Sequence, residues 1–358
     1  MEKINAFTKA YYDFAMKPNE IISSKIYELI LYAFTAPFIW KIRQKCAMLY
    51  NQEIVADIPL FCIIGGISYS GKSTALRFVA NLMGQRGNQI YEYAKDLDKA
   101  GNIYSLITLN NLMPIFADEI SLNFFRASNS SFKGETMIKS LANDVSNEPR
   151  GTLIGTTNAP EFSAVSQVTR RIYYIEVSSK FDMKNRRQDS INYLRQINEE
   201  LDDELFKDFT FRFSEAIRNN EEIFTPEDFL MLTRKIFLDY YEECNMNAPS
   251  YFPHEIFQDY ESKKSAAWRR LFSGNRDCFI DKGKEIQVNI DEIFRNSPNV
   301  KTQKDMLKNF LDETCMTPEF DVGGKWFLRK NEFYKFIDYE QTVLEKTKNI
   351  VLNFFQKS

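Results

Sequence analysis

The chain has 358 residues, which is enough for two or three domains and at least one full-sized hydrophobic core. Its hydrophobic fraction of 44% and charged fraction of 27% are those of a globular protein and exclude a disordered chain. The 46 Lys and Arg residues against 49 Asp and Glu give a net charge of −3, which excludes a strongly basic nucleic-acid coat protein.

The first part of the chain, residues 1–58, is predicted to be helical. Leu29, Ile30, Ala33 and Phe34 recur at the spacing of one helix face. We expect this N-terminal helical segment to pack on the part of the chain that follows it. A contact with nucleic acid or with a partner protein is the alternative.

Residues 59–178 are predicted to form an α/β core. Four short, continuous apolar runs are each typical of a strand buried on both faces, namely residues 60–64, 113–117, 153–157 and 172–177. The stretch from Lys72 to Leu82, between the first two runs, is predicted to be a helix. Strands that alternate with helices indicate a mainly parallel sheet.

Two further parts follow this core. Residues 179–245 are charged and predicted to form a helical lid. Residues 246–358 are predicted to form a mostly helical, winged-helix-like C-terminal domain. In that part, an amphipathic helix over residues 304–311 precedes a Gly-Gly turn and a strand that ends at Leu328.

The segment from Gly66 to Ser73 matches the pattern G-x-x-x-x-G-K-[ST], and it lies between a predicted strand and a predicted helix. Backbone N–H groups of such a loop, together with the helix N-terminus, form a concave site for phosphate. Lys72 is expected to reach the β- and γ-phosphates, and the Ser73 hydroxyl to bind Mg²⁺. We therefore predict an ATP site made by Gly66, Ser70, Gly71, Lys72, Ser73 and Thr74.

A pair of carboxylates, Asp118 and Glu119, follows the second apolar run directly. Both are expected at the C-terminal end of a strand, where α/β sheets build their sites. Asp118 would hold Mg²⁺, and Glu119 would polarise a water for attack on the γ-phosphate. The pair favours hydrolysis over a kinase reaction, because a kinase does not need the second carboxylate.

Polar groups also flank the last two predicted strands. Asn158 ends the third strand, where its amide can position the attacking water or sense the γ-phosphate. Arg170 and Arg171 precede the fourth strand, and a guanidinium can neutralise the charge that develops on a γ-phosphate. Two adjacent arginines at the edge of the core suit a finger supplied to a neighbouring subunit, and a surface ion pair is the alternative.

These motifs, in this order, resemble the P-loop (ASCE/AAA+-like) core of superfamily 3 helicases, above all the primase-associated helicases of phages, plasmids and large DNA viruses. The resemblance covers residues 59–178. The pattern at residues 36–43 is also similar to ATPase regions that bacterial proteins fuse to a phospholipase-D-like nuclease. The resemblance implies a ring, usually a hexamer, in which one subunit supplies Lys72, Ser73, Asp118, Glu119 and Asn158 and the next supplies Arg170 or Arg171. It also implies a DNA-gripping hairpin after Glu119, for which Phe132, Lys133 and Lys139 are loose candidates.

The sequence therefore predicts a ring-forming, Mg²⁺-dependent ATPase that translocates on or unwinds single-stranded or duplex DNA. The alternative is a regulatory ATPase of an anti-phage defence complex that gates a nuclease or other effector and has no helicase activity. We expect a cytoplasmic protein with no membrane partner, because no signal peptide or long apolar run is found. Five cysteines without CxxC spacing favour the same reducing compartment.

Overall fold

The computed structural model contains two compact units, Met1–Asp259 and Tyr260–Ser358. The parts expected at 1–58, 59–178 and 179–245 all lie within the first unit. The structure describes residues 1–16, 18–50, 55, 58–66, 68–85, 89–97, 100–109, 111–125, 134–144, 148–158, 168, 171–177, 179–182, 187–225, 227–256, 259–295, 300–337 and 339.

A parallel five-stranded sheet forms the centre of the first unit. Its strands are β1 (Phe61–Gly66), β2 (Ile90–Glu92), β3 (Ile115–Asp118), β4 (Leu153–Asn158) and β5 (Ile172–Val177). They lie in the order β2-β3-β4-β1-β5. The predicted α/β core with a parallel sheet is confirmed, and each of the four apolar runs forms a strand. The short edge strand β2 was not predicted, because its three residues are only partly buried or exposed.

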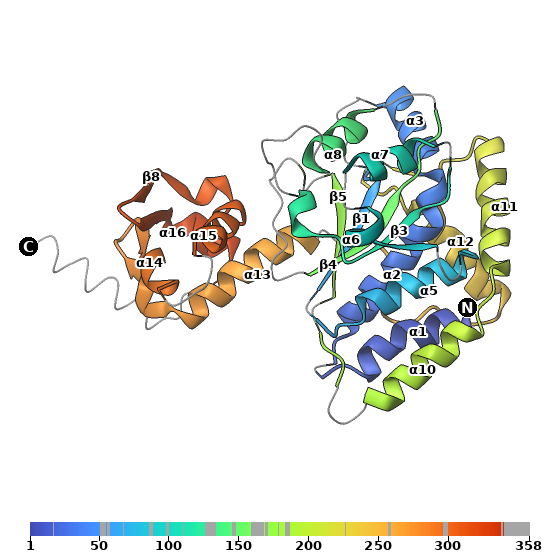
Figure 1. The fold of residues 1–358 in the computed structure, drawn as a ribbon, viewed down its shortest axis with the longest axis horizontal. Helices are drawn as coiled ribbons and strands as arrows, with labels where there is room; N and C mark the ends of the chain where they lie inside the picture. The colour runs from blue at the N-terminus through green and yellow to red at the C-terminus, as the bar shows by residue number, and fades with distance from the viewer. Residues whose placement is uncertain are drawn as a thin grey trace, which may run out of the picture. The chain divides into compact units, whose positions relative to one another are not determined.

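Two helices lie against this sheet and against each other (Figure 1). Helix α5 (Lys72–Leu82) contacts β1, β3 and β4, and helix α2 (Glu20–Thr35) contacts β5. Helix α1 (Glu2–Asp13) packs on α2, and the ring of its Phe7 stacks on Phe78 of α5 with centroids 3.6 Å apart. The N-terminal helices therefore share the hydrophobic core of the sheet.

The other described helices of the first unit surround this centre. They are α3 (Ile39–Leu49), α6 (Tyr93–Asp96), α7 (Ala100–Thr108), α8 (Gly134–Asn143), α10 (Arg187–Glu199), α11 (Glu204–Arg218) and α12 (Met231–Glu243), with 3-10 turns η1 (Ala36–Phe38) and η2 (Leu122–Phe125). Among the described residues, no helix is long and apolar enough to cross a membrane.

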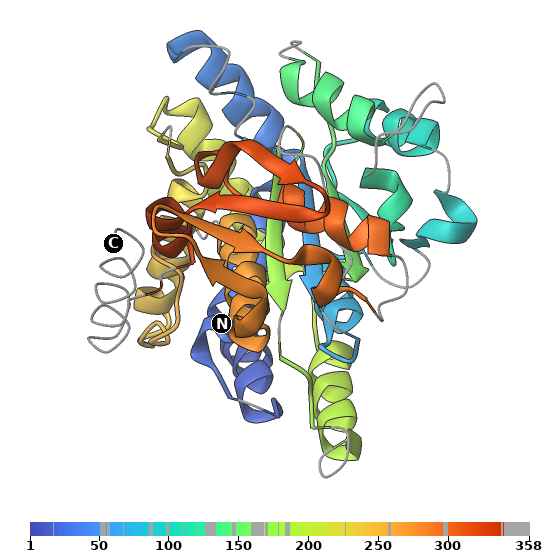
Figure 2. The ribbon, with the colours of Figure 1, turned by 90° about the vertical axis from the view of Figure 1, so that its left-hand side faces the viewer.

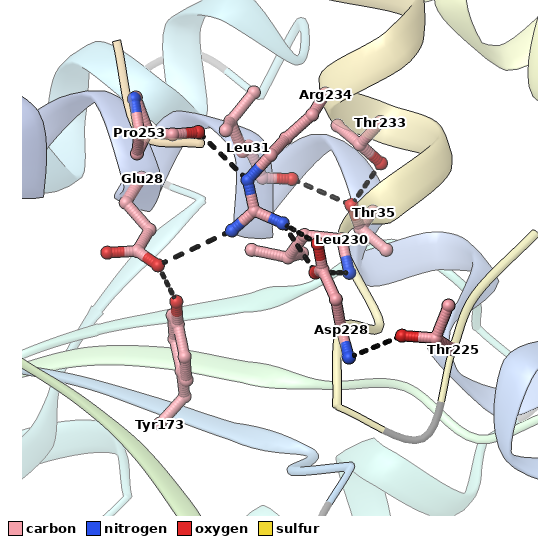
Figure 3. A network of polar contacts seen from close by, with 10 residues as sticks. All are labelled: Glu28, Leu31, Thr35, Tyr173, Thr225, Asp228, Leu230, Thr233, Arg234 and Pro253. Carbon is pink, nitrogen blue, oxygen red and sulfur yellow. Dashed lines mark hydrogen bonds and ion pairs between the residues drawn. The ribbon is translucent and has the colours of Figure 1, made fainter. Parts of the chain in front are cut away.

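A buried polar network joins α2, β5 and α12 (Figure 3). Glu28 of α2 is 1% exposed and accepts a hydrogen bond from the hydroxyl of Tyr173 on β5. A guanidinium nitrogen of Arg234 on α12 lies 3.8 Å from the same carboxylate, while its Nε donates to the carbonyl of Pro253 over 2.9 Å. Arg234 also forms an ion pair with Asp228. Burial, and then the charge of Glu28, raises the pKa of Tyr173 well above its usual value, so this hydroxyl keeps the proton that it donates.

The second unit combines helices with an antiparallel sheet in the order β6-β7-β9-β8. Its elements are α13 (Asp259–Gly274), η4 (Arg276–Cys278), β6 (Phe279–Asp281), β7 (Glu285–Val288), α14 (Ile290–Ile293), α15 (Val300–Asn309), η5 (Glu313–Cys315), β8 (Met316–Val322), β9 (Lys325–Arg329) and α16 (Lys330–Phe336). Figure 2 shows its strands in orange and red.

In chain order, this unit has a helix, the paired strands β6 and β7, two helices, the β8–β9 hairpin and a last helix; β7 also pairs with β9 of the hairpin. Gly323 and Gly324 form the hairpin turn with φ of 60° and 75°, in the left-handed region that favours glycine. The indole of Trp268 is fully buried under the sheet, and its N–H donates to the carbonyl of Leu307 over 3.0 Å. The predicted C-terminal helical region is confirmed, and it contains an antiparallel sheet.

Candidate nucleotide site

The parallel register of the sheet brings the predicted polar residues to one edge. Gly66, the last residue of β1, pairs with Asn158 of β4 on one side and with Val177 of β5 on the other. Asp118 ends β3, which is the next strand beyond β4. Because the C-terminal ends of parallel strands meet at the same edge, the phosphate loop, the carboxylates and the amide lie next to one another.

Both glycines of the loop are required by the space around them. Gly71 has φ of 87°, and a Cβ there would lie 3.0 Å from the rings of Phe181 and Tyr11. A Cβ on Gly66 would lie 2.4 Å from the carbonyl oxygen of Val177. The loop therefore follows a path that only glycine permits at these two positions.

Two side chains of the loop fit the binding of an anion. Ser70 is fully buried, and its hydroxyl has no hydrogen-bond partner among the described residues. The Lys72 ammonium donates to the carbonyl of Gly66 over 2.9 Å. Burial lowers the pKa of Lys72, although the negative charges of Asp118 and Glu119 act in the opposite direction and raise it. A buried hydroxyl that lacks a partner and a partly desolvated cation are the groups that a phosphate would satisfy.

The residues predicted to hold Mg²⁺ are in contact. The hydroxyl of Ser73, in the first turn of α5, donates to Oδ1 of Asp118 over 2.9 Å. Thr74 follows in the same turn and is partly buried. Hydroxyl and carboxylate oxygens are the hard ligands that Mg²⁺ takes together with nucleotide phosphates. In the part of the chain that the structure describes, no three His, Cys, Asp or Glu residues form a metal cluster.

Thr156 of β4 is a member of the site that sequence reasoning missed. Its hydroxyl donates to Oδ1 of Asp118 over 2.5 Å and accepts from the backbone N–H of Glu119 over 2.9 Å. Glu119 itself is exposed and has φ of 57°. A signal was available, because residues two apart on a strand face the same side, and Thr156 lies two before Asn158.

The N-terminal helix reaches the loop as well. The Tyr11 hydroxyl of α1 donates to the carbonyl of Gly71 over 2.8 Å. From the segment after β5, the N–H of Phe181 donates to the carbonyl of Tyr69 over 3.1 Å. Neither contact has a sequence signal, because both join segments that are far apart in the chain.

The two arginines predicted as a finger are placed differently. Arg170 lies outside the described residues. Arg171 is 8% exposed and directly precedes β5. The phosphate loop lies at the C-terminal ends of the strands, whereas Arg171 lies at the N-terminal end of β5. At 3.3 Å per residue, the length of β5 separates the two by about 20 Å. Arg171 therefore does not reach the phosphate site of its own chain.

The candidates for gripping DNA are also spread out. Phe132 and Lys133 lie outside the described residues. Lys139 belongs to helix α8 and forms an ion pair of 2.5 Å with Glu135 one turn earlier. The predicted hairpin therefore stays a prediction for the residues before Gly134 only.

The comparisons with known proteins agree with this geometry. Residues 1–161 match the family model described as the Aq_aa27 P-loop NTPase domain. An uncharacterised protein, aq_aa27, of Aquifex aeolicus (strain VF5) is 31% identical over 100 residues, which are 26% of this chain and 36% of that relative. The chain thus spans about a third of the length of the curated relative that it matches. No solved structure matches.

The chain therefore contains a P-loop NTPase domain. Such a domain binds nucleotide, typically with Mg²⁺, and the arrangement of the site is consistent with NTP hydrolysis. The family match extends from the N-terminal helices through β4, so it includes the phosphate loop, the two carboxylates and Asn158. It does not assign the domain to the superfamily 3 helicases.

Proposed function

We propose that this protein is an Mg²⁺-dependent ATPase that works as a ring-forming motor on DNA. One observation carries the hydrolytic part of the proposal: Ser73 donates to Asp118, and Thr156 joins Asp118 to the backbone of Glu119, at the sheet edge where Asn158 lies beside the phosphate loop. A second carboxylate next to the metal-binding one is what attack by water requires and a simple phosphoryl transfer does not.

The residues divide the work of hydrolysis. Lys72 and the loop N–H groups would hold the β- and γ-phosphates in place. Glu119 would accept the proton of the water as its oxygen attacks the γ-phosphorus, and the Asn158 amide would orient that water. Ser73 and Asp118 would hold Mg²⁺, which when bound neutralises charge on the phosphate oxygens.

The motor part of the proposal draws on two other features. Strand β4 lies between β1 and β3, so the strand that ends in Asn158 separates the loop strand from the carboxylate strand. In the second unit, two helices precede a β-hairpin, which is similar to a winged helix, an arrangement that proteins use to place a helix in the major groove of DNA. The second feature supports a contact with DNA, and the resemblance to ring helicases suggests a homo-oligomer in which a neighbouring copy would supply Arg170 or Arg171. The burial of Arg171 favours Arg170.

The test is the steady-state ATPase rate with and without single-stranded DNA. We expect a several-fold stimulation by DNA that disappears in Glu119→Gln. Glu92→Gln is the matched control, because Glu92 ends β2 at the same sheet edge but is exposed and paired with Lys95. It should retain the wild-type rate and stimulation.

The other outcomes separate the rival functions. Hydrolysis that depends on Glu119 but is indifferent to DNA would replace the motor by the regulatory ATPase, with a nuclease or other effector as partner. If the protein stays monomeric with ATP, as measured by its mass in solution, both the ring-forming motor and the ring-forming regulatory ATPase are contradicted. A monomeric P-loop kinase would then be the better hypothesis.

A further inference from the structure

The hydroxyl of Thr156 lies between the two carboxylate residues of the site. It donates to Asp118 Oδ1 over 2.5 Å and accepts from the N–H of Glu119 over 2.9 Å. Thr156 is 1% exposed, so water does not compete for either bond. One buried hydroxyl therefore links the side chain of the first carboxylate residue to the backbone of the second.

Glu119 needs this support because of its backbone. Its φ of 57° is in the left-handed region, which residues with a Cβ seldom adopt. Strand β4 holds the turn from Glu119 to Ile120 at three points. Besides the hydroxyl bond, the carbonyl of Thr156 accepts from the N–H of Ile120 over 2.7 Å, and the Thr157 hydroxyl donates to the carbonyl of Ile120 over 2.9 Å. Such strain persists only where the surroundings over-determine it, and it is concentrated at functional sites.

We propose that Thr156 is a positioning residue that fixes the direction of the Glu119 carboxylate and so acts on hydrolysis through Glu119. This inference rests on the proposed function, in which Glu119 takes the proton of the water. Thr156 and Asn158 lie two residues apart on one strand and face the same side of the sheet. Strand β4 then carries both the group that orients the water and the group that orients the base.

The experiment compares three single substitutions in the full chain. Thr156→Val removes the hydroxyl and keeps the branched shape, whereas Thr156→Ser keeps the hydroxyl. Thr152→Val is the matched control, because Thr152 is fully buried just before β4 and its hydroxyl has no hydrogen-bond partner among the described residues. If Thr156→Val fails to fold, Thr156→Ala replaces it with the same expected result.

We expect Thr156→Val to lower kcat at least about 10-fold while the KM for ATP changes less than about 3-fold, because positioning acts on the reaction rather than on binding. Thr156→Ser and Thr152→Val should stay within about 3-fold of the wild-type kcat. In the Glu119→Gln background, Thr156→Val should cause no further loss of the residual turnover, since the base that it positions is already absent. In the nucleotide-free protein, hydrogen exchange at the N–H of Glu119 should become faster in Thr156→Val alone.

The outcomes that overturn the two proposals differ. A wild-type protein without Glu119-dependent turnover overturns the proposed function and this inference together. An active wild type whose Thr156→Val variant equals Thr152→Val overturns the inference alone. A loss in Thr156→Val that multiplies with the loss in Glu119→Gln does the same, because it shows that Thr156 acts independently of Glu119.

Discussion

The hydroxyl of Tyr11 donates to the carbonyl oxygen of Gly71 over 2.8 Å, so a helix at the start of the chain holds the phosphate loop 60 residues later. The ring of Tyr11 is 1% exposed and also lies against Phe181, with ring centroids 5.2 Å apart. The N-terminal helix is therefore part of the wall of the nucleotide site, in agreement with a family match that begins at residue 1.

Tyr11→Phe should remove one contact that holds the phosphate loop, and the protein should still fold. Loss of one hydrogen bond to a part-buried carbonyl is expected to cost about 1 kcal/mol, which corresponds to a fall of about 2 °C in the unfolding midpoint of a unit this size. Nucleotide affinity, measured by titration, should fall several-fold. Tyr12→Phe is the control, because the neighbouring ring is 38% exposed. Equal behaviour of the two variants would contradict a role for Tyr11 at the site.

Gly66→Ala should abolish nucleotide binding. The added methyl would lie 2.4 Å from the carbonyl of Val177 and 2.8 Å from the hydroxyl of Ser70, so the loop must move away from its present path. Gly101→Ala is the contrasting change. A Cβ at Gly101 meets nothing within 4 Å, and alanine in helix α7 should stabilise the protein by up to about 1 kcal/mol. Nucleotide titration and thermal unfolding of both variants check this, and retained binding in Gly66→Ala would refute the assignment of the loop.

Lys72→Met should give a nucleotide-free protein that is at least as stable as the wild type. Burial lowers the pKa of Lys72 below its usual 10.5, so the folded state binds fewer protons than the unfolded state between these two pKa values. Stability therefore rises with pH through that interval in the wild type, and Lys72→Met lacks this contribution. The difference in unfolding midpoint between the two proteins should therefore become smaller as the pH rises toward 10.5. A gap that widens would contradict the depressed pKa.

Arg234→Met should destabilise the first unit strongly. The change leaves the buried carboxylate of Glu28, and that of Asp228, without the positive charge of Arg234. Breaking a buried ion pair typically lowers the free energy of unfolding by about 3–5 kcal/mol. Arg212→Met is the matched control, since Arg212 pairs with the exposed carboxylates of Asp208 and Glu243 and should cost less than about 1 kcal/mol. Denaturant midpoints measure both. Similar losses would show that the network contributes no more than a surface ion pair.

Local features of the sequence were sufficient for the central strands and the phosphate loop. The helix predicted over Lys72–Leu82 and the strand predicted over 172–177 have the same bounds in the structure. Both are strongly patterned elements, and a continuous apolar run is typical of a strand buried on both faces. The edge strand β2 was not predicted, because its three partly buried or exposed residues carry no such pattern.

In the candidate site, too, the sequence and the tertiary structure each decided a different part. The sequence was sufficient to predict its chemistry, because a loop of fixed spacing, two carboxylates after one strand and an amide after another predict which groups would meet a phosphate. Only the tertiary structure decided which residues hold those groups in place. The contacts of Tyr11 with Gly71 and of Thr156 with Glu119 depend on packing between distant segments, as does the burial of Arg171 at the opposite end of β5. The spacing of residues within one short segment shows which groups lie together in a motif. The contacts between distant segments depend on how the strands and helices pack in three dimensions, which no local pattern in the sequence shows.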